Sequence, residues 1–189
     1  MAGSSLNFRL ATAEDVVPLV SLINTAFCAD TTTEVFLSAD HARVDVVDAT
    51  GILAKINEPD CAVLAVADPS TGTIMAHGSV RRLANGRAWF GMLAVDVDCQ
   101  GQGLGGRVLA WAEQHARRQW GAPRMEFGVV NTRAELIAWY GRRGYRATGE
   151  MTPFPYHYHG DWQGILRDGL CFITLGKDLG EAPGTSEVA

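Results

Sequence analysis

The segment Gln100-Gly101-Gln102-Gly103-Leu104-Gly105-Gly106 constrains the fold of this chain more than any other segment. An apolar-rich stretch at residues 87–97 predicts a strand before it. A helix from Gly103 to Trp120 is predicted after it by an apolar stripe at Leu104, Val108, Trp111, Ala112 and His115. Glycine permits close backbone approach and positive φ, and a helix start presents unpaired N–H groups and a positive dipole end. The pattern therefore predicts a strand-to-helix turn that cradles a diphosphate.

Two other phosphate-binding motifs resemble this turn. Gly101-x-Gly103-x-x-Gly106 matches a dinucleotide fingerprint, and Glu126 follows Gly106 by 20 residues. A doubly wound domain begins with that unit, however, whereas about 100 residues precede this turn and too few follow it. A P-loop would need Lys-Ser/Thr where Arg107-Val108 stands. An ordinary glycine-rich turn without a ligand is the remaining alternative.

The order of predicted elements indicates a mixed α/β sheet. It reads strand, two helices, three strands, helix, strand, helix and two strands, so hairpins join the central strands and crossover helices join the later ones. The predicted strands lie at residues 8–11, 61–67, 73–82, 87–97, 125–130, from 144, and 170–177. The predicted helices lie at residues 12–27, within 40–57 with an interruption at Gly51, 103–120 and 132–140. Capping boxes are predicted at Thr12–Asp15 and Thr132–Glu135. One domain is expected over residues 1–179, with a flexible tail at 180–189.

Asn85-Gly86 is the strongest hairpin signal and predicts the register of two strands. A two-residue turn would pair His77 with Ala94 and Trp89 with Arg82, so His77 and Trp89 would face opposite sides of the sheet. A bulge before Leu93 would change that register.

Composition excludes several classes of protein. With 189 residues, 47% hydrophobic and 20% charged, the chain can bury one sizeable core. A net charge of −5 disfavours non-specific binding to nucleic acid or to an acidic membrane. The four scattered cysteines contain no C-x-x-C pair, which disfavours a disulfide framework. Neither a signal peptide nor an apolar run of ~18 residues is evident, so a cytoplasmic protein is expected.

Gln100, Gly103 and Gly105 occupy the three positions of a Q/R-x-x-G-x-G/A motif. This motif resembles that of the GNAT N-acetyltransferase superfamily. Residues 127–145 resemble the family's second signature, with a strand, then Asn131, a helix bearing Tyr140, and Gly144-Tyr145. The order of elements is similar as well. The resemblance implies a central sheet that splays at a bulge, with acetyl-CoA as co-substrate.

The resemblance also implies which residues hold the cofactor. Leu93, Ala94 and Val95 would bond the pantetheine arm and the thioester carbonyl through their backbone. The pyrophosphate would lie on Gln100, Gly101, Gln102, Gly103, Leu104, Gly105 and Gly106. Arg107 could add positive charge, or could be a solvated helix residue. The Asn131 amide would bond the pantetheine, or could simply be a helix-entry residue.

Acyl transfer to an amine needs a proton donor for the leaving thiolate and a base for the amine. The resemblance gives Tyr140 the donor role, and the alternative is a tyrosine packed at a helix end. In the histone-acetylating branch a glutamate lies four residues before the position of Leu93, where this chain has Trp89. An aromatic wall of the acceptor pocket is expected there instead. The base candidates are Glu34, His77, Glu126, His157 and His159. The alternative for each is a structural or solvated side chain without a catalytic role.

The aromatic segment at residues 154–162 could line the acceptor pocket through Phe154 and Tyr156, or serve as a lid or a homodimer contact. His157, His159 and Asp161 alternate within it, but zinc sites normally draw ligands from several elements, so no metal is expected. The expected activity is N-acetylation of a primary amine, on a small molecule or a peptide, by direct attack in a ternary complex. No cysteine lies in an activating context for a covalent route. A non-catalytic acyl-CoA-binding sensor and a nicotinamide-dependent oxidoreductase are the alternatives.

Overall fold

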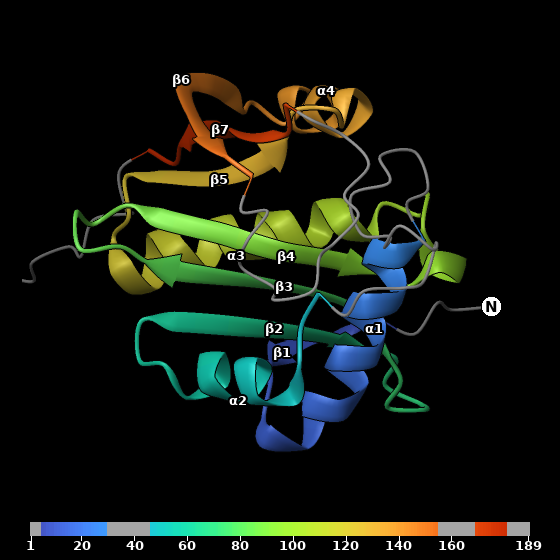
Figure 1. Ribbon diagram of the computed structural model, residues 1–189. Coiled ribbons are helices and arrows are strands. Elements are labelled where there is room, and N and C mark those ends of the chain that lie inside the picture. Colours follow the sequence, from blue (N-terminus) through green and yellow to red (C-terminus); the bar gives the residue numbers. More distant parts are fainter. Residues whose placement is uncertain (1–4, 30–45, 155–168, 181–189) are drawn as a thin grey trace, which may run out of the picture.

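The computed structural model describes residues 5–29, 46–154 and 169–180. They form a mixed α/β fold around a seven-stranded sheet with the strand order β1-β2-β3-β4-β5-β7-β6 (Figure 1). The strands are β1 Asn7–Leu10, β2 Cys61–Ala67, β3 Ile74–Arg82, β4 Ala88–Val95, β5 Arg124–Val130, β6 Arg146–Pro153 and β7 Cys171–Asp178. The helices are α1 Val16–Cys28, α2 Ala49–Asn57, α3 Leu104–Trp120 and α4 Ala134–Gly141, with short 3-10 turns η1 Ala13–Asp15 and η2 Val97–Cys99. The expected fold class and element order are confirmed.

Two apolar cores lie on opposite faces of the sheet. α3 packs against β3 and β4 on one face (Figure 1). The side chains buried on that face also include Tyr140 of α4. α1 packs on the same two strands from the other face, with α2 beside it over β2. β4 is therefore covered by helices on both faces, by α3 on one and by α1 on the other.

Of the two predicted capping boxes, one is present and one is not. At Thr12 the backbone N–H donates to the Asp15 carboxylate at 2.7 Å, and the Arg9 guanidinium pairs with that carboxylate at 2.6 Å. At α4 the predicted box is wrong, because Arg133 is the N-cap residue and the Thr132 hydroxyl is buried without a hydrogen-bond partner among the described residues. Gly51 does not interrupt α2; its N–H donates to Asp48 at 2.7 Å and helps to begin the helix.

The β3–β4 hairpin has a three-residue loop, not the predicted two-residue turn. The Leu83 N–H donates to the Arg87 carbonyl at 2.8 Å, and Gly86 takes a φ of 80° between them. Trp89 consequently pairs with Arg81 rather than with Arg82. The longer loop is the usual form when a left-handed glycine precedes the second strand.

A β-bulge restores the predicted partner of His77. Ser79 pairs with Gly91 but His77 pairs with Ala94, so Met92 and Leu93 together oppose Gly78. Met92 takes the positive φ of 56°, an uncommon conformation for a residue with a side chain. Because the bulge inserts one residue, His77 and Trp89 lie on the same face of the sheet, contrary to simple alternation.

Candidate functional site

The two parallel strands β4 and β5 separate soon after they pair. Their register contains only Ala88 with Met125 and Trp89 with Glu126. From Phe90 onward, the edge of β4 that faces β5 has no partner strand, and the bulge at Met92 turns it further away. The backbone groups along this edge are therefore available to an extended ligand lying between the strands.

The glycine loop begins α3 with a row of unpaired backbone N–H groups. Gly101 and Gly103 take φ values of 77° and 78°, which only glycine adopts readily. Within the described residues, the N–H groups of residues 101–105 make no hydrogen bond. Such a row at the positive end of a helix dipole is suited to bind an anion, as the sequence predicted.

Side chains of the loop brace it instead of projecting toward a ligand. Gln100 donates to the Val95 carbonyl at 3.3 Å, and Gln102 donates to the Asp98 carbonyl at 3.4 Å. The Asp96 carboxylate accepts from the Asp98 N–H at 2.9 Å. Gln100 and Gln102 thus hold the shape of the loop, and the unpaired groups of residues 101–105 belong to its backbone.

Trp139, which the sequence did not single out, lies where the tip of β4 meets α3. A Cβ built on Gly105 would contact the indole of Trp139 at 3.7 Å, Val95 at 3.7 Å and Leu93 at 3.8 Å. Leu93 and Val95 are half-buried and Ala94 is buried. The glycine at 105 therefore keeps open a narrow space between β4, α3 and α4.

Arg107 lies on the side of α3 that faces β1. Its guanidinium carbon is 4.7 Å above the centre of the Phe8 ring, and the residue is exposed. This cation–π contact directs the Arg107 side chain toward β1, which the sequence pattern did not predict. Its role toward a phosphate remains a prediction.

Tyr140 lies in an aromatic cluster under the opening between the strands. Its ring is 4.4 Å from that of Phe127 on β5 and 4.8 Å from that of Trp139. The residue is 4% exposed, and this burial raises the pKa of its phenol. The phenol therefore stays protonated, and its hydroxyl makes no hydrogen bond within the described residues.

Asn131 ties the end of β5 to the start of β7. Its amide nitrogen donates to the Gly169 carbonyl at 3.1 Å, and its amide oxygen accepts from the Cys171 N–H at 3.3 Å. Both ends of the amide are thus engaged within the protein. The predicted bond from Asn131 to a pantetheine would use the second N–H of the amide or the second lone pair of its oxygen.

His77 is a buried core residue on the face covered by α1. It is 1% exposed, and its Nδ1 lies 2.9 Å from the Leu64 carbonyl, so the neutral ring donates there. Burial lowers the pKa of His77 to about 4. A group with that pKa takes a proton from an amine poorly, which weighs against its role as the base.

Glu126 is the buried carboxylate beside Trp89, and two arginines neutralise it. Arg87 bonds it at 2.9 Å and Arg124 at 2.6 Å. Trp89 itself is half-buried at this position of the sheet. These ion pairs make Glu126 a structural anchor between β4 and β5 rather than a free base.

Of the remaining acceptor-side candidates, Phe154 alone lies in the described chain. It is buried and stacks on Phe172 of β7 with ring centres 5.2 Å apart. Glu34, Tyr156, His157, His159 and Asp161 lie outside the described residues. Their roles remain predictions.

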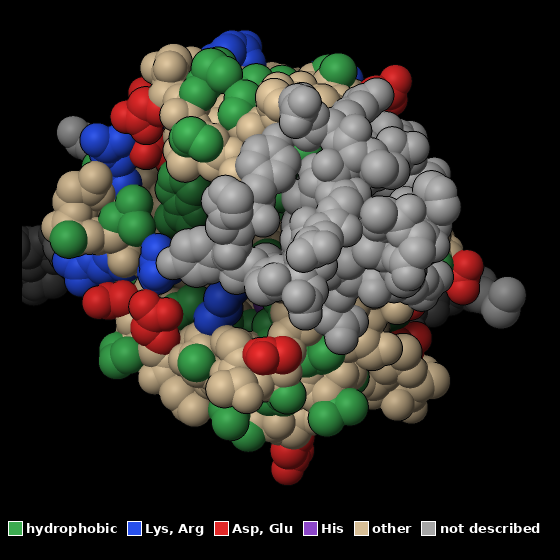
Figure 2. Space-filling view, viewed as in Figure 1, with side chains coloured by type: hydrophobic (Ala, Val, Ile, Leu, Met, Phe, Trp, Pro, Cys, Tyr) green, Lys and Arg blue, Asp and Glu red, His purple; other side chains and the backbone are tan. Residues whose placement is uncertain are grey.

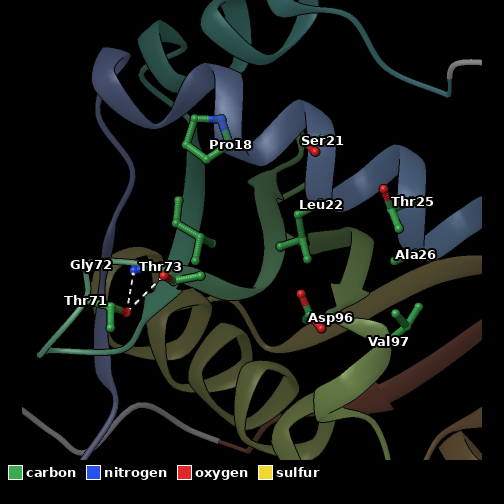
Figure 3. A pocket seen from close by; sticks show the side chains of 11 residues that line it. Pro18, Ser21, Leu22, Thr25, Ala26, Thr71, Gly72, Thr73, Asp96 and Val97 are labelled. Carbon is green, nitrogen blue, oxygen red and sulfur yellow. Dashed lines mark hydrogen bonds between the residues drawn. The ribbon is translucent and has the colours of Figure 1, made fainter.

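A separate surface hollow of about 430 Å³ lies between α1 and the end of β4 (Figure 3). Ser21 and Thr25 of α1 line it from one side, and Thr73 and Asp96 from the other. Among the described residues, none of those predicted from the sequence to form the site lines this hollow. On the face seen in Figure 2, acidic and basic side chains are interspersed rather than gathered by sign.

Two further structural findings concern the described residues alone. They contain no helix long and apolar enough to cross a membrane. No group of three His, Cys, Asp or Glu side chains among them is placed to hold a metal ion.

The comparison with known families identifies the chain. Residues 28–145, more than half of its length, match the acetyltransferase (GNAT) family. The chain belongs to the GNAT acetyltransferase family. The match spans the bulged strand β4, the glycine loop and both α3 and α4. No curated protein matches the chain.

Solved structures of GNAT proteins share the fold at low sequence identity. A protein assigned as a phosphinothricin N-acetyltransferase is 19% identical with a TM-score of 0.67, the match covering 94% of this chain and 100% of that one. The yncA protein of Salmonella typhimurium, solved with its cofactor acetyl-CoA, is 20% identical with a TM-score of 0.67, over 96% and 99% of the two chains. The ribosomal-protein-S18-alanine N-acetyltransferase of Escherichia coli is 15% identical with a TM-score of 0.67, over 96% and 98%.

Proposed function

We propose that this GNAT protein transfers an acetyl group from acetyl-CoA to a primary amine by direct attack in a ternary complex. The observation that carries the proposal is the row of unpaired N–H groups at residues 101–105, which follows the stretch of β4 that no longer pairs with β5. A diphosphate would accept from these groups, and an extended pantetheine arm would follow the free edge of β4. The buried, unpartnered hydroxyl of Thr132, in the turn after β5, is a further polar atom that a ligand could satisfy.

Each described residue would then have a separate role. The glycine loop would hold the diphosphate, and the β4 backbone around Leu93 would orient the thioester and stabilise charge on its carbonyl oxygen. Tyr140 would donate its phenolic proton toward the leaving sulfur. Trp89 would form a wall of the acceptor pocket, as the sequence predicted. Two related structures are named for a small-molecule acceptor and for an alanine of a ribosomal protein, which supports an amine acceptor of either size.

The direct test is release of CoA from acetyl-CoA, measured with a thiol reagent over a panel of amines that includes amino acids, polyamines and short peptides. We expect turnover with at least one primary amine and none with the corresponding alcohols. Saturable acetyl-CoA binding without turnover across a broad panel would contradict the enzyme assignment. It would favour the acyl-CoA sensor, which the replacement of a family glutamate by Trp89 permits.

Replacing Tyr140 with phenylalanine tests the proton donor within this reaction. The aromatic cluster survives the change, so the Michaelis constant for acetyl-CoA should change little while kcat falls by about 10² or more. The loss should shrink with an acyl donor whose thiol is more acidic, because that thiolate needs a proton less. A variant that keeps more than about a third of wild-type kcat, with chemistry rate-limiting, would leave Tyr140 only a packing role.

A further inference from the structure

Arg143, just after α4, presents a fixed positive charge to the start of α3. Its guanidinium carbon lies 3.6 Å from the centre of the Trp139 ring, and its Nη1 donates to the Trp139 carbonyl at 3.0 Å. These two contacts hold the guanidinium over the indole. The side chain is therefore oriented before any ligand arrives, which reduces the entropy cost of using it.

The opposite edge of this guanidinium faces the glycine loop. A Cβ built on Gly106 would lie 3.3 Å from Nη2 and 3.4 Å from Nε of Arg143. Neither of these two nitrogens makes a hydrogen bond within the described residues. The Nε–Nη2 edge is the fork that binds phosphate with two parallel hydrogen bonds. Gly106 leaves room for this approach, since any larger residue would crowd the fork.

Arg143 also lies close enough to Tyr140 for its charge to act there. It opposes the rise in the Tyr140 pKa that burial causes. The same guanidinium thus lies near both the proposed proton donor and the proposed diphosphate cradle. Arg107, the cation that the sequence pattern suggested, faces Phe8 on β1 instead.

We infer that Arg143, stacked on Trp139, is the side-chain cation that binds the diphosphate of the acyl carrier at the start of α3. The inference rests on the proposed function, because it assigns a further residue to the same site. Arg143 is a positioning residue here: it orients the carrier and takes no part in bond making.

The test is the dissociation constant for three ligands, measured by calorimetry or by competition. These are CoA, dephospho-CoA, which keeps the diphosphate but lacks the 3′-phosphate, and pantetheine, which has no phosphate. Losing a charged hydrogen-bonded pair should weaken binding by about tenfold or more. We therefore expect Arg143→Gln to weaken CoA and dephospho-CoA by about the same factor and to leave pantetheine unchanged.

A neighbouring arginine supplies a matched control. Arg142 is exposed on the same turn, so Arg142→Gln should stay within about threefold of the wild type. Arg143→Lys should fall between the wild type and Arg143→Gln, since it keeps the charge and loses the fork. Melting curves of every variant report whether it is folded.

Three outcomes would overturn the inference. Equal CoA binding by Arg143→Gln and the wild type would remove Arg143 from the site. A penalty that disappears with dephospho-CoA would assign Arg143 to the 3′-phosphate, and an equal penalty with pantetheine would make its role structural. If the wild type itself does not bind CoA, the proposed function fails together with this inference; if it binds and turns over, only the assignment of Arg143 is at stake.

Discussion

At the scale of single residues, His77 links the pH dependence of stability to the buried face of β3. Its pKa is lowered from 6.5 to about 4 by burial, so between these values the unfolded chain binds a proton that the folded chain excludes. The free energy of unfolding should therefore fall as the pH drops from 6.5 toward 4, by up to about 3 kcal/mol. Asp15 acts at lower pH, because its pKa is lowered from 3.8 to about 2.

Chemical denaturation of wild type and His77→Asn at several pH values isolates this contribution. The asparagine amide can keep the hydrogen bond to the Leu64 carbonyl but does not titrate. The two stability curves should converge as the pH falls through this window, since only the wild type loses stability by protonating His77 in the unfolded state. Parallel curves would show that His77 keeps an ordinary pKa and would reopen its assignment as the base.

The partners of individual side chains were the part of the structure that the sequence predicted least well. The pattern placed charge at Arg107 because it follows the glycines directly, whereas the fold brings Arg143 to the same loop from 37 positions farther along the chain. Contacts between α3 and α4 depend on tertiary packing, which local periodicity does not report. The partners that occupy the amide of Asn131 come from the start of β7 and were hidden for the same reason.

At the scale of elements, β3 approaches α3 closely at Gly78, the residue opposite the bulge in β4. A Cβ on Gly78 would lie 2.7 Å from Cγ1 of Val108 and 3.1 Å from Phe90, and both of these side chains are buried. Gly78→Ala should therefore destabilise the fold by about 1–3 kcal/mol through overpacking. Val108→Ala removes the clashing methyl, so the cost of Gly78→Ala should be smaller in that background by about 1 kcal/mol or more. Additive effects in the double-mutant cycle would contradict the close approach.

The sequence predicted the identity of the elements better than their ends and their register. The sequence pattern located every β-strand and α-helix that the described residues contain, but not the short 3-10 turn η2 after β4. The loop of the hairpin was predicted one residue too short, because Asn-Gly is compatible with both two- and three-residue loops. The bulge at Met92 could only be offered as a condition, since no local residue type forces a positive φ there.

At the scale of the whole molecule, the fold and the family were predictable because two motifs at the right separation occur in the right order of elements. The mixed sheet and the separation of β4 from β5 were implied by that resemblance, and the structure contains both. The walls of the acceptor pocket were harder to predict from the sequence. Pocket walls depend on side chains from several elements and loops, and a glutamate expected from one branch of the family is Trp89 in this chain.

The central claim is that the glycine loop and the tip of β4 form one acetyl-CoA site. The most direct measurement is calorimetric titration of acetyl-CoA, with NAD(H) for comparison, into the wild type and Gly105→Val. The wild type should bind acetyl-CoA saturably at one site, be stabilised by it, and show no such response to NAD(H). Gly105→Val should remain folded but bind far more weakly, because its methyls would fill the space between Trp139, Leu93 and Val95. Undiminished affinity in the folded variant, or an equal response to NAD(H), would contradict the account.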